Sequence, residues 1–371
     1  MPIGKNNNLG SMRNVYLKYG TLISPIGNGI NAHFNAFITN TSGLNWVDSI
    51  GFNKENLPLG KISIPENNSL QFMLNSACEA LIKEHTSDRL NSPKTCFIIS
   101  STKADLSQLP NDTFEPLRTI LKAHFPTSNE PIIISNACIS GVVALNLAAQ
   151  YIQSERYDDS FVIGIDAISD FVIYGFQSLF ALSDEMCQPF DKTRKGINLG
   201  EACGIIHLTS RKEKAFCVEY VSGKTSNDAN HISGPSRTGE GLFRAVSNAL
   251  KEAEISATDI DFISAHGTGT IFNDDMESIA FNRLGMQGIP LNSMKGYFGH
   301  TLGAAGVIET LICMLSMEHS MLFKSLGFDE QGTPESLNIL SENQEKKCQY
   351  VLKTASGFGG GNAVLILKSV R

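Results

Sequence analysis

The fold of this chain is decided by the stretch Pro131-Ile132-Ile133-Ile134-Ser135-Asn136-Ala137-Cys138-Ile139-Ser140-Gly141. A β-branched run that begins at a proline predicts a buried strand, and the apolar segment 139–152 behind it predicts a helix. Cys138 therefore stands where a strand turns into the N-terminus of a helix, a corner at which free backbone N–H groups and the helix dipole favour a thiolate. Because the thiolate is the nucleophile, the stretch predicts a reactive cysteine, with a buried structural cysteine as the alternative.

The composition limits the class of protein. The chain has 371 residues, of which 42% are hydrophobic and 18% charged, enough for a large core and two domain-sized halves. Its net charge of −7 argues against general nucleic-acid binding. The longest apolar runs fall short of the roughly 18–20 residues of a membrane span. Eight scattered cysteines without a C-x-x-C pair, and no signal-peptide pattern, predict reduced thiols and a cytoplasmic location.

The order of predicted elements indicates an α/β fold. Residues 1–11 look like a vector-derived leader, so we expect the fold to begin at Met12. A charged run at 210–214 suggests a division into an N-terminal half, 12–212, and a C-terminal half, 213–371. Strands and helices alternate in both halves. The predicted strands are 96–100, 161–165, 204–208, 216–221, 260–265, 346–352 and 363–368, and the predicted helices are 68–84, 139–152, 239–253 and 301–317.

Two of these predicted helices are apolar nearly all round. The segments 139–152 and 301–317 both carry small and branched apolar residues on every face, so neither is typical of a surface helix. Each follows a reactive residue, Cys138 in one case and His300 in the other. A duplicated half with one central buried helix per half would explain both observations.

Two glycine-rich motifs carry histidines. His266-Gly267-Thr268-Gly269-Thr270 follows an apolar strand, and glycines let a ligand approach the backbone while the threonines offer hydroxyls. A tight turn around a hydrogen-bonded histidine is the alternative. His300 opens the second buried helix, in which Glu309 lies among apolar residues. A buried carboxylate needs a partner, and Lys295, one short loop earlier, is the predicted one.

A last motif, Ser356-Gly357-Phe358-Gly359-Gly360-Gly361-Asn362, is a turn before the final strand and would let a backbone N–H point into a site.

The residue types alone are also compatible with other kinds of site. Cys138, His266 and His300 could bind zinc, although structural zinc ligands usually come in close pairs. A papain-like cysteine protease would use a cysteine on a helix with a histidine and an asparagine, and it leaves the second histidine without a role.

Together, the motifs resemble those of the β-ketoacyl-[acyl-carrier-protein] synthases of the decarboxylating, elongating type. The resemblance runs from about Met12 to the end of the chain, in the order of the family. The matching segments are 136–141, 189–196 with 199–201, 228–231, 266–270 with Asn273, Asp274 and Glu277, 295–306, and 357–362.

This resemblance implies a thiolase-like fold of two pseudo-repeated halves in α-β-α-β-α layers, usually dimeric. It implies that Cys138 takes an acyl chain from a carrier-protein thioester, with the backbone N–H groups of Cys138 and Phe358 as the oxyanion hole. His266 and His300 then stabilise the enolate formed when malonyl-carrier protein loses carbon dioxide, and a 3-oxoacyl product two carbons longer results. Lys295 is counted with Cys138, His266 and His300 as a catalytic residue, Glu309 would support it, and neither a metal nor a redox cofactor is required.

The resemblance also suggests roles around the site. Thr268 and Thr270 match positions that hold the phosphopantetheine arm of the acyl carrier protein, and Phe358 matches a residue that gates the acyl pocket. Ile139 stands where a small residue is usual and would reshape that pocket. We expect the carrier protein to dock on a basic turn made of Lys192, Arg194 and Lys195.

Related families and roles give rival interpretations. A thiolase would carry a second cysteine near the last glycine turn, where this chain has Phe358, and a starter-unit synthase would use Cys-His-Asn. A non-catalytic chain-length partner of a heterodimeric ketosynthase typically loses the nucleophile, which this chain keeps. We therefore expect a homodimer, or a heterodimer with such a partner, that elongates acyl chains in fatty-acid or polyketide synthesis.

Overall fold

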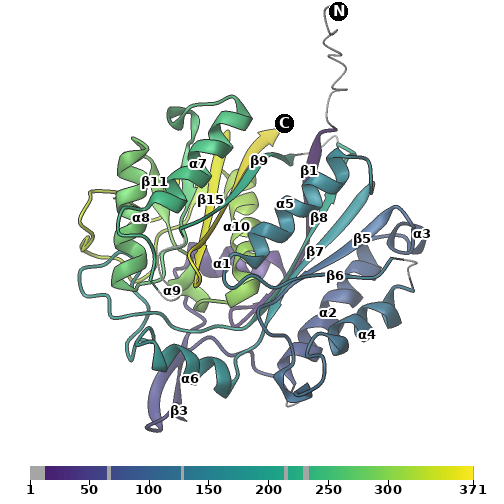
Figure 1. Ribbon diagram of the computed structural model, residues 1–371, viewed down its shortest axis with the longest axis horizontal. Coiled ribbons are helices and arrows are strands. Elements are labelled where there is room, and N and C mark those ends of the chain that lie inside the picture. Colours follow the sequence, from purple (N-terminus) through teal and green to yellow (C-terminus); the bar gives the residue numbers. More distant parts are fainter. Residues whose placement is uncertain (1–12, 65–67, 127–128, 213–215, 229–233, 371) are drawn as a thin grey trace, which may run out of the picture.

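The computed structural model describes residues 13–64, 68–126, 129–212, 216–228 and 234–370 (Figure 1). The expected leader, 1–11, and residues 229–231 of the motif that begins at Asp228 lie outside the described residues. Within them, one long mixed sheet runs through the molecule, and two smaller two-stranded sheets lie apart from it.

The long sheet consists of two similar sets of five strands. In the N-terminal set the order is β1 (Val15–Ser24), β8 (Ala202–Thr209), β7 (Asp159–Asp166), β5 (Thr95–Ser100) and β6 (Ile132–Ile134). In the C-terminal set the order is β9 (Cys217–Asn227), β16 (Gly361–Val370), β15 (Tyr350–Gly357), β10 (Phe262–Ser264) and β11 (Pro290–Asn292), with β13 (Asn338–Ile339) beyond it.

The pairing of these strands repeats between the sets. In each, the first two pairings are antiparallel and the next two are parallel. The sets join where β1 meets β9, with Val15 opposite Tyr220 and Leu17 opposite Val218. The predicted duplication is therefore confirmed by strand order and direction, although the residue-level similarity is weak.

Helices form three layers around the two sets. The outer face of the N-terminal set is covered by α2 (Ser69–Glu84) and α4 (Glu115–His124), and that of the C-terminal set by α7 (Glu240–Ala253) and α8 (Ile271–Arg283). Two buried helices, α5 (Ser140–Gln153) and α10 (Ala305–His319), contact strands of both sets and lie between them. The result is the predicted α-β-α-β-α order of layers.

The remaining elements are short or peripheral. They are α1 (Ile30–Ile38), α3 (Ser87–Leu90), α6 (Asp170–Ser178), α9 (Lys295–Phe298), three 3₁₀ turns at 106–108, 257–259 and 302–304, and the strands β2 (Gly27–Asn28), β3 (Asn45–Ile50), β4 (Glu55–Leu59), β12 (Met321–Leu322) and β14 (Gln344–Glu345). The strand predicted at 346–352 begins later and runs on to Gly357, which brings its end to the site described below.

The two central helices touch backbone to backbone. A Cβ atom on Gly141 would lie 2.7 Å from the amide nitrogen of Val307, and one on Gly306 would lie 2.5 Å from the amide nitrogen of Val142. Real Cβ atoms keep about 3.5 Å or more from such neighbours, so both positions require glycine. Because Cys138 and His300 come just before these helices, this crossing brings the two halves of the site together.

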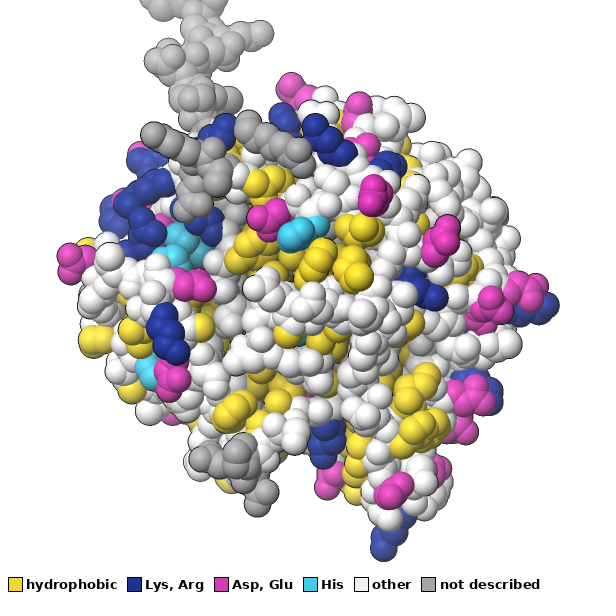
Figure 2. All heavy atoms as spheres, turned by 180° about the vertical axis from the view of Figure 1, so that it is seen from behind, with side chains coloured by type: hydrophobic (Ala, Val, Ile, Leu, Met, Phe, Trp, Pro, Cys, Tyr) yellow, Lys and Arg dark blue, Asp and Glu magenta, His cyan; other side chains and the backbone are white. Residues whose placement is uncertain are grey.

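The α10 segment is apolar for its length. With the 3₁₀ turn before it, residues 302–319 are long and apolar enough to cross a membrane, but 89% of this window is buried inside the fold, which identifies it as a core helix. On the face seen in Figure 2, basic and acidic side chains are interspersed around hydrophobic groups.

Candidate active site

Cys138 sits on a strained corner between β6 and α5. Ala137 before it has φ of 46°, a left-handed conformation that is uncommon for a residue with a Cβ. Ser140 stabilises the corner: its Oγ accepts from the Asn136 N–H at 2.7 Å and donates to the Ala137 carbonyl at 2.6 Å. The turn projects the thiol toward the C-terminal half, as in other strand–turn–helix nucleophile sites.

His266 follows β10 on a turn whose backbone is held by carboxylates of α8. The N–H groups of His266 and Gly267 donate to Glu277 at 2.8 and 2.6 Å, and those of Thr268 and Gly269 donate to Asp274 at 2.9 and 3.1 Å. Gly269 has φ of 75°, and a Cβ there would lie 2.7 Å from the Gly196 carbonyl oxygen. The glycine-rich motif is therefore a rigid turn that fixes the His266 ring.

His300 is the second histidine of the site. Its N–H donates to the Asn198 carbonyl at 2.8 Å, and neither of its ring nitrogens has a hydrogen-bond partner among the described residues. The rings of His266 and His300 meet edge to face, with centroids 5.2 Å apart. A ligand atom of Cys138 lies within 4.8 Å of one on each ring, so the three predicted residues converge.

A buried cluster of charge lies next to the histidines. Lys295 Nζ is 2.8 Å from Glu309 Oε1, so the predicted pair is confirmed, and it also donates to the His266 carbonyl oxygen. Sequence reasoning missed Lys353 of β15, whose Nζ lies 2.6 Å from the other oxygen of Glu309. The sequence did contain a signal for Lys353, because it is a lysine within the apolar run from Tyr350 to Ala355, and a charged side chain is rarely buried without a partner.

Electrostatics set the resting protonation states. Burial raises the pKa of the Cys138 thiol to about 11, and the charge of Lys295 only partly offsets this. The expected thiolate is therefore wrong for the resting protein, because α5 begins only at Ser140 and desolvation outweighs its dipole. Burial lowers the pKa of His266 and of His300 well below 6.5, and the positive charges of Lys295 and Lys353 lower both further. Both rings are neutral at pH 7.

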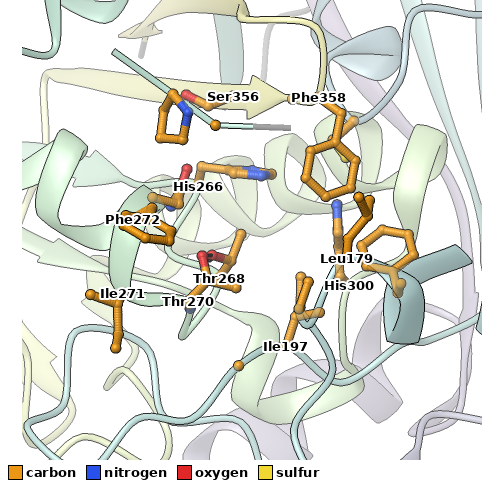
Figure 3. Close-up of a pocket in the computed structure, with 18 of the residues that line it drawn as sticks. Leu179, Ile197, His266, Thr268, Thr270, Ile271, Phe272, His300, Ser356 and Phe358 are labelled. Atoms are coloured by element: carbon orange, nitrogen blue, oxygen red, sulfur yellow. Dashed lines mark hydrogen bonds between the residues drawn. The ribbon is translucent and has the colours of Figure 1, made fainter. Parts of the chain in front are cut away.

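A pocket of about 950 Å³ opens above these three side chains. In Figure 3 the rings of His266 and His300 point into it, Phe358 lies beside His300, and Thr268 and Thr270 stand along one wall. The two threonine hydroxyls are 2.7 Å apart and hydrogen-bond each other. Sequence reasoning missed the apolar residues at the pocket, which come from α6, the segment after it and the start of α8, namely Phe176, Leu179, Phe180, Ile197, Ile271 and Phe272. It also missed the polar residues Ser236, Arg237 and Thr238.

Phe358 is placed at the turn between β15 and β16. Its main chain hydrogen-bonds the Cys138 sulfur, which lowers the pKa of that thiol slightly against the effect of burial. Its ring is 37% exposed and lies 5.4 Å from that of Phe176. Gly359 and Gly360 after it have φ of 87° and 77°, conformations that favour glycine.

Metal binding was the other interpretation of this set of residues. Within the described part of the chain, Cys138, His266 and His300 are the one group whose three ligand atoms converge closely enough to suggest an ion. The positive charges of Lys295 and Lys353 lie close to both histidines and disfavour a cation. We assign no metal to the site.

Two family models match the chain. The beta-ketoacyl synthase N-terminal domain matches residues 130–214 and the C-terminal domain matches residues 218–329, together more than half of the sequence. The chain belongs to the beta-ketoacyl synthase family. Cys138 lies in the first match, and His266 and His300 lie in the second.

This chain is similar to curated members of the family over part of their length. Putative polyketide beta-ketoacyl synthase 1 of Streptomyces halstedii is 31% identical over 251 residues. The 3-oxoacyl-[acyl-carrier-protein] synthase 2 of Rhizobium meliloti (strain 1021) is 32% identical over 253 residues. Each match covers 63% of this chain and 59% or 60% of the relative, so the chain matches about three fifths of these synthases.

Solved structures of ketosynthases share the whole fold. A ketosynthase complex from Xenorhabdus doucetiae, ApeO with its chain length factor ApeC, superposes with a TM-score of 0.84 at 24% identity and full coverage of both chains. The AntDE:AntF complex of a type II polyketide carrier protein with its ketosynthase gives 0.84 at 23% identity, covering 97% of this chain and all of that one. The synthase has the thiolase-like α/β fold of two pseudo-repeated halves.

The structure corrects the predicted docking turn of this synthase. The Arg194 side chain is 4% exposed and pairs with Asp275 at 2.6 Å and Asp274 at 3.8 Å, so it is a structural residue and the docking prediction is wrong for it. Lys192 and Lys195 are exposed, but each pairs with a glutamate, at 3.1 and 2.6 Å. Lys195 also lines the pocket.

Ile139 does not lie where the resemblance suggested. It is buried in the main core, and its Cδ1 is 2.9 Å from the position of a Cβ on Gly361. Since the pocket is lined by other residues, the prediction that Ile139 shapes it is not supported. The apolar wall is made instead by Phe176, Leu179 and Ile197.

Proposed function

We propose that this synthase catalyses a decarboxylative Claisen condensation between an acyl chain held on Cys138 and malonyl-acyl-carrier protein. The observation that carries the proposal is the convergence of a cysteine and two neutral histidines at the floor of one pocket. The product is a 3-oxoacyl-carrier protein two carbons longer. The names of the relatives, a polyketide synthase and a 3-oxoacyl-[acyl-carrier-protein] synthase, support the same activity.

In the first half-reaction the Cys138 sulfur attacks the thioester carbonyl of an acyl-carrier protein. The carbonyl oxygen becomes negative and is stabilised by the backbone N–H groups of Cys138 and Phe358. The thiol proton ends on the departing carrier thiol, so the step is neutral overall and a neighbouring neutral imidazole can relay the proton. Because burial raises the pKa of the Cys138 thiol, the thiol stays protonated until a thioester is bound and its proton can be passed on.

In the second half-reaction malonyl-carrier protein enters and loses carbon dioxide. The charge that develops on its thioester oxygen is met by N–H groups of His266 and His300. Both rings face the pocket, and neither ring nitrogen of His300 has a hydrogen-bond partner among the described residues. The carbanion then attacks the acyl-Cys138 carbonyl, the bond from that carbonyl carbon to the Cys138 sulfur breaks, and the released thiolate takes up one proton from solvent to regenerate the thiol. A neutral imidazole can fill this role because one of its two ring nitrogens carries an N–H that donates a hydrogen bond.

The partner of this reaction is an acyl carrier protein with a phosphopantetheine arm. Thr268 and Thr270 hold the arm along the wall of the pocket, and Lys195 at the pocket contributes to docking. We place the synthase in the cytoplasm, as a homodimer or as a heterodimer with a chain length factor. The half-buried strand β6 lies at one end of the long sheet, where a second chain can pair with it.

The test combines intact mass with separate assays of the two half-reactions. Incubation with acyl-carrier proteins of several chain lengths should add one acyl group, and Cys138→Ala should prevent the addition while Cys78→Ala, in the buried face of α2, should not. His266→Ala and His300→Ala should keep acylation but reduce malonyl decarboxylation by roughly two to three orders of magnitude. A wild-type chain that takes up no acyl group from any carrier would favour the non-catalytic chain-length partner instead.

A further inference from the structure

Lys353 lies in the core beneath the two histidines. It is fully buried, and its Nζ lies 3.2 Å from the Ser264 carbonyl oxygen, 3.3 Å from that of Ala265 and 2.6 Å from Glu309 Oε2. These carbonyls belong to the two residues that precede His266, and Glu309 belongs to the helix that follows His300. One ammonium group therefore joins both histidine-bearing segments to β15, the strand that ends beside Phe358.

Lys353 shares Glu309 with Lys295. Glu309 Oε1 lies 2.8 Å from Lys295 Nζ, and Lys295 donates to the carbonyl oxygen of His266, with Nδ1 of that ring 3.4 Å away. Two ammonium groups and one carboxylate leave a net charge of +1 in a buried cluster. A pair made by Lys295 and Glu309 alone would already satisfy the carboxylate, so the structure holds one positive charge more than pairing requires.

Such a charge is costly in a core. Burying an ammonium group costs several kcal/mol unless its partners compensate, and an apolar side chain of similar length would fill the same volume. The other charged or titratable side chains around the two rings are Lys295, Glu309, Glu277, Asp274, Cys138 and Cys313. Both glutamates and Asp274 are already engaged by N–H groups or by lysines.

We propose that Lys353 is a positioning residue that fixes the His266 and His300 segments relative to each other and holds both rings in the neutral form that donates to the enolate. This inference rests on the function proposed above. The mechanical part follows from the three contacts of its ammonium group. The electrostatic part follows from the surplus positive charge, which opposes protonation of either ring, in agreement with the pKa values of both histidines.

The variant that tests this is Lys353→Met, which keeps most of the side-chain volume and leaves Lys295 and Glu309 as a neutral pair. The imidazole signals of labelled protein are followed by NMR against pH, with His266→Gln and His300→Gln as assignment variants. In Lys353→Met we expect the pKa of at least one of the two rings to rise by about one unit. The acid limb of the pH profile of malonyl decarboxylation should then move to higher pH by the same amount, while acylation of Cys138 is retained.

Two further variants separate charge from packing. Lys353→Met combined with Glu309→Gln leaves the single charge of Lys295, so the cluster returns to +1. Its imidazole pKa values should move back toward those of the wild type even though the contacts are still missing. Lys346→Met is the control, because Lys346, which lies just before β15, also donates to a backbone carbonyl, that of Asp261, but is outside the site.

The outcomes are distinct. Unchanged imidazole titration and an unchanged pH profile in Lys353→Met would overturn the inference, as would an equal loss of both half-reactions accompanied by lowered thermal stability. A wild-type protein with neither half-reaction would refute the proposed function instead. The imidazole titrations need no substrate, so they still decide whether Lys353 keeps the rings neutral.

Discussion

The crossing of α5 and α10 makes a specific prediction for Gly306→Ala. The added methyl carbon would lie 2.5 Å from the Val142 nitrogen and 2.9 Å from the Gly141 carbonyl carbon, both backbone atoms that cannot rotate away. An ordinary contact is about 3.5–4.0 Å, so the helices must separate by about 1 Å. Overpacking of this kind costs about 1–3 kcal/mol, partly offset by about 1 kcal/mol from the better helix propensity of alanine.

The same displacement should reach the active site. Cys138 precedes α5 and His300 precedes α10, so separating the helices separates the proposed nucleophile from the proposed enolate donor. A misplacement of about 1 Å at a reacting group can cost about 100-fold in rate. We expect Gly306→Ala to lower the midpoint of urea unfolding and to reduce condensation by one to two orders of magnitude, roughly, with acylation affected less.

The matched control is Gly175→Ala in α6. A Cβ there would meet nothing within 4 Å, so alanine should leave the protein as stable or add up to about 1 kcal/mol. Urea unfolding and the two half-reaction assays are run on both variants. If Gly306→Ala behaves like Gly175→Ala, the close crossing does not hold the two halves of the site together and the reasoning is refuted.

Four further predictions follow from individual side chains. Arg194→Met should destabilise the protein by about 3–5 kcal/mol and lower activity equally with carrier-bound and small thioesters, because it removes the positive charge next to the buried carboxylate of Asp274 and the partner of Asp275; a selective rise in the carrier KM would restore its docking role. Lys195→Glu should raise only the carrier KM, and an equal effect on a small thioester would contradict docking. Burial lowers the pKa of His33 to about 4, so its contribution to stability is present above about pH 6.5 and is lost as the pH falls, by about 2 kcal/mol at pH 5. Urea unfolding at pH 8 and pH 5 should therefore show a smaller acid loss in His33→Gln than in the wild type. Phe358→Ala should keep acylation but release carbon dioxide from malonyl-carrier protein without an acyl-enzyme, as measured by carbonate release; normal coupling would make the ring a packing residue.

Much of the site could be predicted from local sequence. Cys138 and His266 each follow a predicted strand, and the carboxyl ends of strands in an α/β sheet are where sites assemble. His300 opens a predicted buried helix. The glycines around them mark turns, and the apolar helices behind Cys138 and His300 indicate burial. These signals are short-range, since hydrophobic period and turn residues are read within a few positions of the chain.

Other features of the site depend on residues that are far apart in the sequence but close in space. Arg194 and Lys195 are neighbours in one basic turn, yet the first is buried against carboxylates of α8 and the second is exposed at the pocket. The thiol of Cys138 was predicted to ionise from its helix, but its pKa is set by how deeply the C-terminal half buries it. Desolvation depends on every segment that packs around a group, and the sequence near that group does not contain this information.

The sequence by itself thus determined part of the strands and helices, among them the two central helices, that the chain is an α/β protein of two similar halves, and which three side chains are the candidates for the chemistry. Only the tertiary structure decided that Lys353 shares Glu309 with Lys295, that both imidazoles are neutral, and that Phe176, Leu179 and Ile197 form the wall of the pocket. The physical reason is that periodicity and turn chemistry act between neighbours along the chain. Burial, ion pairing and the shape of a pocket arise between residues that meet only after the two halves have packed around α5 and α10.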